Sequence, residues 1–186
     1  MKRIPALSLK NSPLRNDSKL ARQRGASLLE GIAYLGIAAL VVLGAVSLLT
    51  GAFSSAKSNQ ANEEVIALRT AIRKLYIGQV YPADIMPGLV AANAVPGTLI
   101  KAADGTVTNS WGGAVTASAD SSSNGFNLVY QAVPQDVCVN MLSGANGWVS
   151  IAGTTTITTF PVTTSAATGT CTVTTNAGNT LTFKGV

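Results

Sequence analysis

No charged side chain occurs between Gly31 and Ala56, and this stretch of 26 residues limits the possible folds more than any other part of the chain. It is largely apolar and contains no proline, which favours a helix. At about 1.5 Å per residue such a helix would be roughly 39 Å long, more than the ~30 Å hydrocarbon core of a bilayer. The sequence therefore predicts a segment that can span a membrane.

The excess of basic residues lies ahead of this apolar stretch. Residues 1–25 contain seven lysines and arginines and one acidic residue, Asp17, whereas the rest of the chain has six basic and seven acidic side chains. The net charge of +5 therefore does not describe the downstream domain, and no nucleic-acid binding is predicted. A basic N-terminal segment is typical of a signal that stays in the cytoplasm while the following chain crosses the membrane.

A conventional signal peptide and an uncleaved membrane anchor are two simpler explanations of this region. A signal peptidase would cut near small residues such as Ala45-Val-Ser47, but these lie inside the apolar stretch. Neither explanation accounts for Glu30 at the edge of that stretch. An ionised carboxylate there costs of order a few kcal/mol unless it is paired, which makes Glu30 a candidate functional residue.

The segment Arg22-Gln-Arg-Gly25-Ala26-Ser-Leu-Leu-Glu30 resembles the processing region of type IV prepilins, most closely of the type IVb branch. The resemblance rests on Gly25 before a small residue, on Glu30 at the fifth position after it, on the basic leader and on the apolar stretch. In that family a prepilin peptidase cuts after the glycine and methylates the new N-terminal amine, here that of Ala26. The resemblance implies a leader over residues 1–25, which this peptidase removes.

The resemblance also gives Glu30 a role in assembly. Cleavage would create an ammonium group at Ala26, four residues before Glu30. At about 4 Å and an effective dielectric constant of ~20, the two charges attract by about 4 kcal/mol, a value similar to their desolvation cost. In the family the carboxylate pairs with a neighbouring subunit and sets the register of the filament. A contact within one helix is the alternative, because residues four apart share a helix face.

The helical pattern continues beyond the polymerisation segment, residues 26–53, into an amphipathic segment, residues 54–78. Apolar residues recur there at helical spacing, at Val65, Leu68, Ile72 and Leu75. Gly78 and Pro82 provide a stop, so one helix from about Ser27 to Ile77 is expected. Related filaments melt part of this helix on assembly, and Gly44 and Gly51 are the candidate positions for such melting here.

The remainder of the chain predicts an α+β pilin fold, in which the long N-terminal helix packs on an antiparallel sheet. Residues 54–186 would form the globular domain, with a connecting loop over residues 79–110 that has room for short helical pieces. The expected strands are Ala114–Ala119, Phe126–Val133 and Thr180–Lys184, and a short helix is expected over Val137–Leu142.

Cys138 and Cys171 lie in the half of the chain that would be exported, with 32 residues between them. This spacing excludes a thioredoxin-type motif or a paired-cysteine zinc motif, and a disulfide is expected in an oxidising compartment. Closing such a loop stabilises a domain by about 3 to 4 kcal/mol. In the family the enclosed segment, here 138–171, is exposed on the filament. It contains the threonine-rich run Thr154–Thr164, which we expect to form a strand pair or a polar loop.

The sequence offers no catalytic constellation. The chain has no histidine, its carboxylates are scattered, and neither a calcium loop nor a glycine-rich phosphate loop is present. No enzyme activity, metal or cofactor is therefore expected.

These observations predict a type IVb major pilin that serves adhesion, aggregation, conjugation or motility. The precursor would reside in the inner membrane, and the mature subunit would then assemble into an extracellular pilus on a Gram-negative cell. The implied partners are further copies of the chain, the prepilin peptidase, the inner-membrane assembly machinery and a receptor on a host or bacterial surface. A minor pilin, a pseudopilin of type II secretion and a membrane-anchored periplasmic binding domain are the alternatives.

Overall fold

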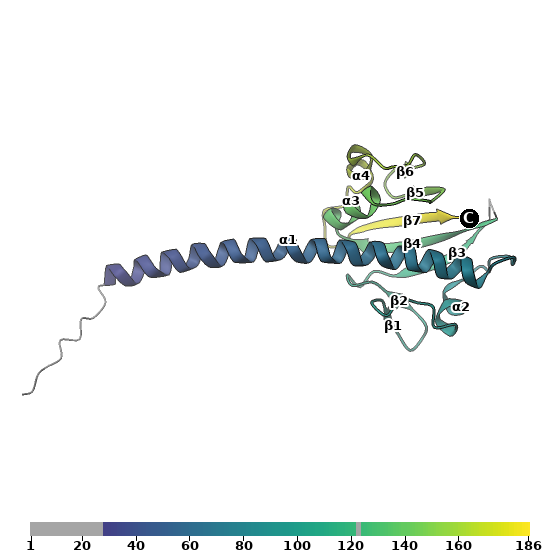
Figure 1. The fold of residues 1–186 in the computed structure, drawn as a ribbon, viewed down its shortest axis with the longest axis horizontal. Coiled ribbons are helices and arrows are strands. Elements are labelled where there is room, and N and C mark those ends of the chain that lie inside the picture. Colours follow the sequence, from purple (N-terminus) through teal and green to yellow (C-terminus); the bar gives the residue numbers. More distant parts are fainter. Residues whose placement is uncertain (1–27, 122–123) are drawn as a thin grey trace, which may run out of the picture. The chain divides into compact units, whose positions relative to one another are not determined.

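A computed structural model describes residues 28–121 and 124–186 of the chain (Figure 1). Helix α1, Leu28–Leu75, is the longest element, with 48 residues. The chain divides after Leu43 into two compact units, which are described separately below. The expected continuous helix is confirmed over the described residues, and Gly78, with a φ of 71°, lies in the turn that follows it. That φ favours glycine, which has no Cβ to clash.

The second unit, residues 44–186, is built on a five-stranded antiparallel sheet of order β3-β4-β7-β5-β6. Its strands are β3 (Val115–Asp120), β4 (Gly125–Val133), β5 (Ser150–Ala152), β6 (Thr156–Ile157) and β7 (Asn179–Gly185). The longest strands coincide with the three expected ones, which alternate apolar and polar residues. The two short strands were not predicted.

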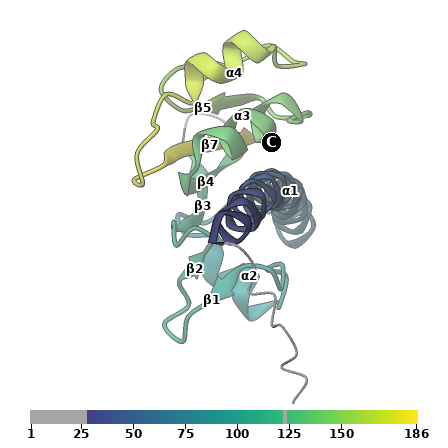
Figure 2. The same ribbon diagram turned by 90° about the vertical axis from the view of Figure 1, so that its left-hand side faces the viewer.

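The amphipathic half of α1 packs against this sheet (Figure 2). The expected stripe is confirmed, since Val65, Leu68 and Ile72 are buried and Leu75 packs against the same core. Sheet residues such as Phe126 complete that core. The α+β arrangement of a long helix on an antiparallel sheet therefore matches the sequence-based prediction.

Residues 79–110 contain more regular structure than the expected connecting loop. Helix α2, Met86–Ala91, is followed by a two-stranded antiparallel ribbon of β1, Ile100–Lys101, and β2, Val107–Thr108. Two main-chain hydrogen bonds attach residues 82–85, which precede α2, to the edge strand β3. They run from Ile85 N to Ala117 O (2.9 Å) and from Ala119 N to Pro82 O (3.1 Å). The region is therefore an ordered part of the domain.

Two further short helices flank the other end of the sheet, on the opposite side of α1 from α2 and the ribbon (Figures 1 and 2). Helix α3, Gln135–Ser143, begins after Pro134, as expected from the sequence. Helix α4, Thr164–Thr170, was not predicted, and its first turn is capped by the Thr163 hydroxyl, which accepts a hydrogen bond from Ala166 N.

Candidate assembly surfaces

The N-terminal part of α1 presents a nearly continuous apolar surface. The helix is long and apolar enough to cross a membrane, by length and composition. The large apolar side chains exposed on it are Leu28, Leu29, Ile32, Tyr34, Leu35, Ile37, Leu40, Val41, Val42, Leu43, Val46, Leu48, Leu49 and Phe53. Exposed apolar surface of this extent marks a membrane or protein contact, because water contact with it is unfavourable.

Glu30 lies in the first turn of α1, and its side chain is exposed. A carboxylate in the first turn is favoured by the helix dipole. Gly25 and Ala26, the other residues of the predicted processing and assembly motif, lie outside the described residues. The pairing of Glu30 with the amine of Ala26 therefore stays a prediction.

Glu64 forms a buried polar contact between α1 and the sheet that sequence reasoning missed. Its carboxylate accepts hydrogen bonds from the hydroxyl of Tyr130 on β4 and from Gln60 Nε2 (2.8 Å), which also donates to Ser110 Oγ (3.2 Å). The pKa of Tyr130 lies well above its usual value. Burial is the larger cause, and the hydrogen bond to Glu64 is the second. Together with the apolar stripe, the contact holds one face of α1 against β4.

Arg69 makes a second contact from α1 that the sequence did not predict. Its guanidinium lies 4.9 Å from the centre of the Trp148 ring, and Nη1 donates to Asn146 O at 3.3 Å. Gly147 has a φ of 73°, and a Cβ there would lie 2.7 Å from Arg69 Nη1. The positive φ favours glycine at this position, and a side chain there would also displace the end of Arg69. Burial, followed by repulsion from Arg73, lowers the pKa of Arg69.

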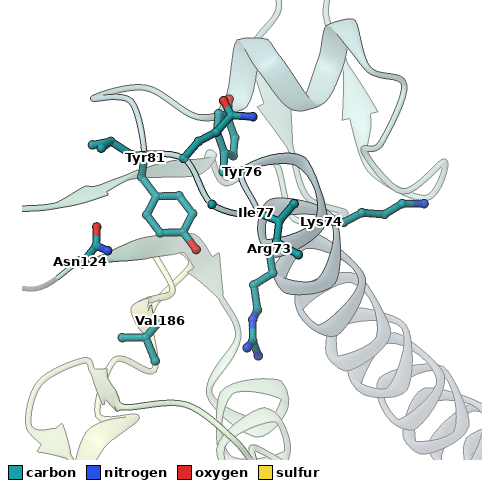
Figure 3. A pocket seen from close by; sticks show the side chains of 10 residues that line it. Arg73, Lys74, Tyr76, Ile77, Tyr81, Asn124 and Val186 are labelled. Atoms are coloured by element: carbon teal, nitrogen blue, oxygen red, sulfur yellow. The ribbon is translucent and has the colours of Figure 1, made fainter.

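A hollow of about 690 Å³ lies where α1 ends (Figure 3). Its lining residues are Arg73, Lys74, Tyr76, Ile77, Gly78, Gln79, Val80, Tyr81, Asn124 and Val186. We call the segment Arg73–Val80 the tip of the domain. The tip combines two cationic side chains with two apolar ones, Ile77 and Val80, which are 79% and 83% exposed.

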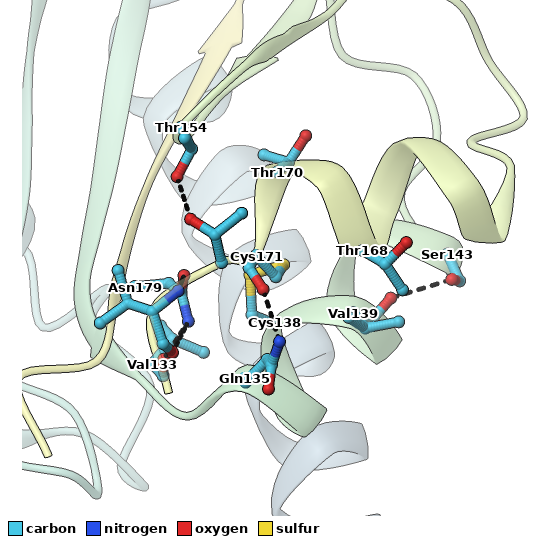
Figure 4. Close-up of a disulfide and its surroundings, with 12 residues drawn as sticks. Val133, Gln135, Cys138, Val139, Ser143, Thr154, Thr168, Thr170, Cys171 and Asn179 are labelled. Atoms are coloured by element: carbon cyan, nitrogen blue, oxygen red, sulfur yellow. Dashed lines mark hydrogen bonds between the residues drawn. A yellow bond between two sulfur atoms is a disulfide. The ribbon is translucent and has the colours of Figure 1, made fainter. Parts of the chain in front are cut away.

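The disulfide between Cys138 and Cys171 connects α3 with the end of α4, at a Cα–Cα distance of 5.9 Å (Figure 4). Gln135 Nε2 donates to Cys171 O at 3.0 Å beside it. Hydrogen bonds between threonine hydroxyls attach the turn between β5 and β6 to the chain around Cys171. The Oγ1 atoms of Thr154 and Thr172 lie 2.8 Å apart, and those of Thr155 and Thr170 lie 2.6 Å apart. The threonine-rich run, expected as a strand pair or a polar loop, contributes the short strand β6 of the hairpin and continues without strand structure up to α4.

The described residues, 28–121 and 124–186, contain no group of three or more His, Cys, Asp or Glu side chains that could hold a metal ion. Glu63 and Glu64 are neighbours on α1 but lie on different sides of the helix, since Glu63 is exposed and Glu64 is buried.

Comparisons with known proteins find a matching family model, sequence relatives and a solved structure with a similar fold. The family model described as PilS N terminal matches residues 55–185. The major structural subunit of bundle-forming pilus of Escherichia coli O127:H6 (strain E2348/69 / EPEC) is 30% identical over 147 residues, which cover 74% of this chain and 76% of that protein. The subunit of the same name from Escherichia coli O111:H- is 29% identical over the same length.

A solved structure resembles the fold as well. The crystal structure of a type IVb pilin from Salmonella typhi aligns with a TM-score of 0.53 and 28% sequence identity, and the alignment covers 66% of this chain and 94% of that one. Sequence and structure comparisons thus agree on one group of proteins.

Proposed function

The chain belongs to the PilS family of type IVb pilins, and from this premise we propose that it is the major structural subunit of a type IVb pilus. The observation that carries the proposal is the row of exposed apolar side chains on α1 between Leu28 and Phe53. Helices of many copies, packed together in the core of a filament, would remove this surface from water. Apolar burial of about 25 cal/mol per Å² would then drive assembly.

The same helix would hold the protein in the inner membrane before assembly. A prepilin peptidase would remove residues 1–25 by cutting between Gly25 and Ala26, and would methylate the new amine. The basic leader supports this order of events, because it resists transfer across the membrane. The inner-membrane assembly machinery would then transfer the subunit into an extracellular pilus on a Gram-negative cell.

Glu30 would pair with the Ala26 amine of a neighbouring subunit in the filament. Its place in the first turn of an apolar helix supports this role, since the carboxylate would otherwise be buried without a partner. The segment enclosed by Cys138 and Cys171 would face outward and contact a receptor on a host or bacterial surface. Adhesion, aggregation, conjugation and motility are the activities that such a filament serves.

The filament yield of Glu30 variants tests this proposal. In Glu30→Ala the ammonium group of Ala26 loses its partner, so we expect at least about a tenfold lower amount of sheared filaments, as for a loss of ~1.4 kcal/mol per contact. The total amount of the chain in the cell and the removal of its leader should not change. Immunoblots of the shear fraction, electron microscopy and the mass of the mature chain measure these quantities.

Glu63→Ala is the matched control, because Glu63 is an exposed carboxylate elsewhere on α1. If wild-type filaments consist mainly of this chain, then the chain is a major pilin and not a minor pilin or a pseudopilin. A normal filament yield from Glu30→Ala would contradict the role proposed for the carboxylate.

A further inference from the structure

A groove of about 520 Å³ lies between α2, β2 and the edge strand β3. Its apolar lining comes mainly from Met86, Pro87, Val90, Val107 and Val115. Two carboxylates, those of Asp84 and Asp104, also line it, and no lysine or arginine is among the described residues that do so. We call this surface the acidic groove.

Local hydrogen bonds hold both carboxylates of the acidic groove in place. Asp84 Oδ1 accepts from Met86 N at 3.1 Å, and Asp104 Oδ1 accepts from Thr106 N at 2.9 Å and from Thr106 Oγ1 at 2.7 Å. The hydrogen bond from the Thr106 main chain, and then the one from its hydroxyl, lower the pKa of Asp104 because both favour the ionised carboxylate. Both negative charges are thus fixed before any partner arrives.

The tip, Arg73–Val80, has the complementary properties. Among the large apolar side chains described in residues 54–186, those of Val80 and Ile77 are the most exposed. Arg73 and Lys74 precede them, and within the described part of the chain no carboxylate lies within ion-pair distance of either cation. The tip therefore offers exposed apolar side chains next to cations, which is the complement of an apolar groove that carries carboxylates.

The tip does not reach the acidic groove of its own subunit. The ring of Tyr81 lies 5.9 Å from that of Tyr76 and 5.4 Å from that of Phe126, which fixes both ends of the turn on the sheet. The bond between Ala119 N and Pro82 O holds the next residue along the chain. The tip and the groove share no lining residue, so the tip does not fill the groove of its own subunit.

We propose that the tip of one subunit docks into the acidic groove of a second copy of this chain. Ile77 and Val80 would cover the apolar lining. Arg73 and Lys74, which leave the last turn of α1 in different directions (Figure 3), would each meet one of the two separate carboxylates, Asp84 and Asp104. Because two different surfaces of the same chain meet, the contact is head-to-tail and leaves a free tip and a free groove for the next copies. This inference rests on the proposed filament function and names contacts between its globular domains.

Charge reversal in the full-length chain tests the contact in piliated cells. Arg73→Glu with Lys74→Glu gives a tip variant, and Asp84→Lys with Asp104→Lys gives a groove variant. Each variant expressed alone would bring like charges together, and we expect at least a tenfold loss of sheared filaments. Expressed together, the two variants should form mixed filaments in which they alternate. The negative tip of the tip variant then meets the positive groove of the groove variant, and the unchanged tip of the groove variant meets the unchanged groove of the tip variant. Intact masses of the sheared subunits show whether both chains are present in similar amounts.

Milder variants keep the test independent of folding. Asp84→Asn with Asp104→Asn keeps the oxygens that accept from Met86 N and Thr106 N but removes the charges. We expect its filaments to dissociate at lower shear than wild-type filaments. Arg73→Lys with Lys74→Arg, and Glu63→Gln at an exposed position of α1, are the controls and should behave as wild type.

Normal filaments from the singly expressed charge variants, or no recovery on co-expression, would overturn the contact while leaving the filament function intact. An absence of wild-type filaments would overturn the proposed function and this contact together.

Discussion

Glu64 is an acidic residue on the buried face of α1, between Ala61 and Leu68 at helical spacing. A buried carboxylate is tolerated only with hydrogen-bond partners, and the hydroxyl of Tyr130 and the amide of Gln60 provide them. The sequence shows the acid on the apolar stripe, but it does not show the partner, because Tyr130 lies 66 positions away. Pairings over such distances depend on the fold of the whole domain.

Replacing Tyr130 by phenylalanine measures the value of this contact. Tyr130→Phe removes the donor and leaves one buried carboxylate oxygen without it, so we expect the free energy of unfolding to fall by about 1 to 3 kcal/mol. Thermal unfolding of the full-length chain in detergent measures the change. Tyr34→Phe, on the exposed part of α1, is the matched control and should have no effect. An unchanged midpoint for Tyr130→Phe would show that the contact does not stabilise the domain.

The same residue gives a pH dependence on the alkaline side. Burial raises the pKa of Tyr130, so the folded protein keeps this proton above pH ~10, where the unfolded chain releases it. The unfolded state then binds fewer protons, and stability falls as the pH rises, by up to ~1.4 kcal/mol per pH unit from this group. Tyr130→Phe should reduce this slope above pH ~10, and an identical slope would contradict the assignment.

At the scale of elements, the long periodic segments were predictable and the short ones were not. The apolar stripe of α1 and the alternation in β3, β4 and β7 extend over enough residues for a pattern to emerge. Strand β6 has only two residues, so no pattern can form. Helix α4 has the sequence Thr-Ser-Ala-Ala-Thr-Gly-Thr, which is poor in strong helix formers. Tertiary contacts and the disulfide stabilise it instead.

Loss of the disulfide should therefore affect α4 more than the sheet. Cys138→Ser removes a constraint worth about 3 to 4 kcal/mol on the chain-entropy estimate, so we expect a lower thermal midpoint and fewer surface pili. Amide exchange in Thr164–Thr170 should accelerate more than that in β4 and β7. Wild-type protein treated with a reductant is the control and should behave as the variant does. Equal exchange in α4 with and without the disulfide would contradict this prediction.

At the scale of the whole molecule, the N-terminal apolar surface and the globular domain have different requirements. The apolar surface requires a membrane or neighbouring copies, whereas the domain has its own core, built from the second half of α1 and the sheet. The sequence predicted the first from a run of uncharged residues. It did not predict the tip or the acidic groove, because α2 and the ribbon bring Asp84 and Asp104 to one surface only in the folded domain.

If the leader keeps the apolar surface in the membrane, then blocking its removal should stop assembly without unfolding the domain. Gly25→Val places a larger, β-branched side chain next to the predicted scissile bond. We expect a precursor that keeps residues 1–25, stays in the membrane fraction, forms the Cys138–Cys171 disulfide and yields no filaments. Intact mass, non-reducing electrophoresis and electron microscopy measure these properties. Ala21→Val, a similar enlargement elsewhere in the leader, is the control and should be processed normally. A wild-type mature N-terminus beyond Phe53 would contradict the entire assembly proposal, because it would remove the polymerisation helix.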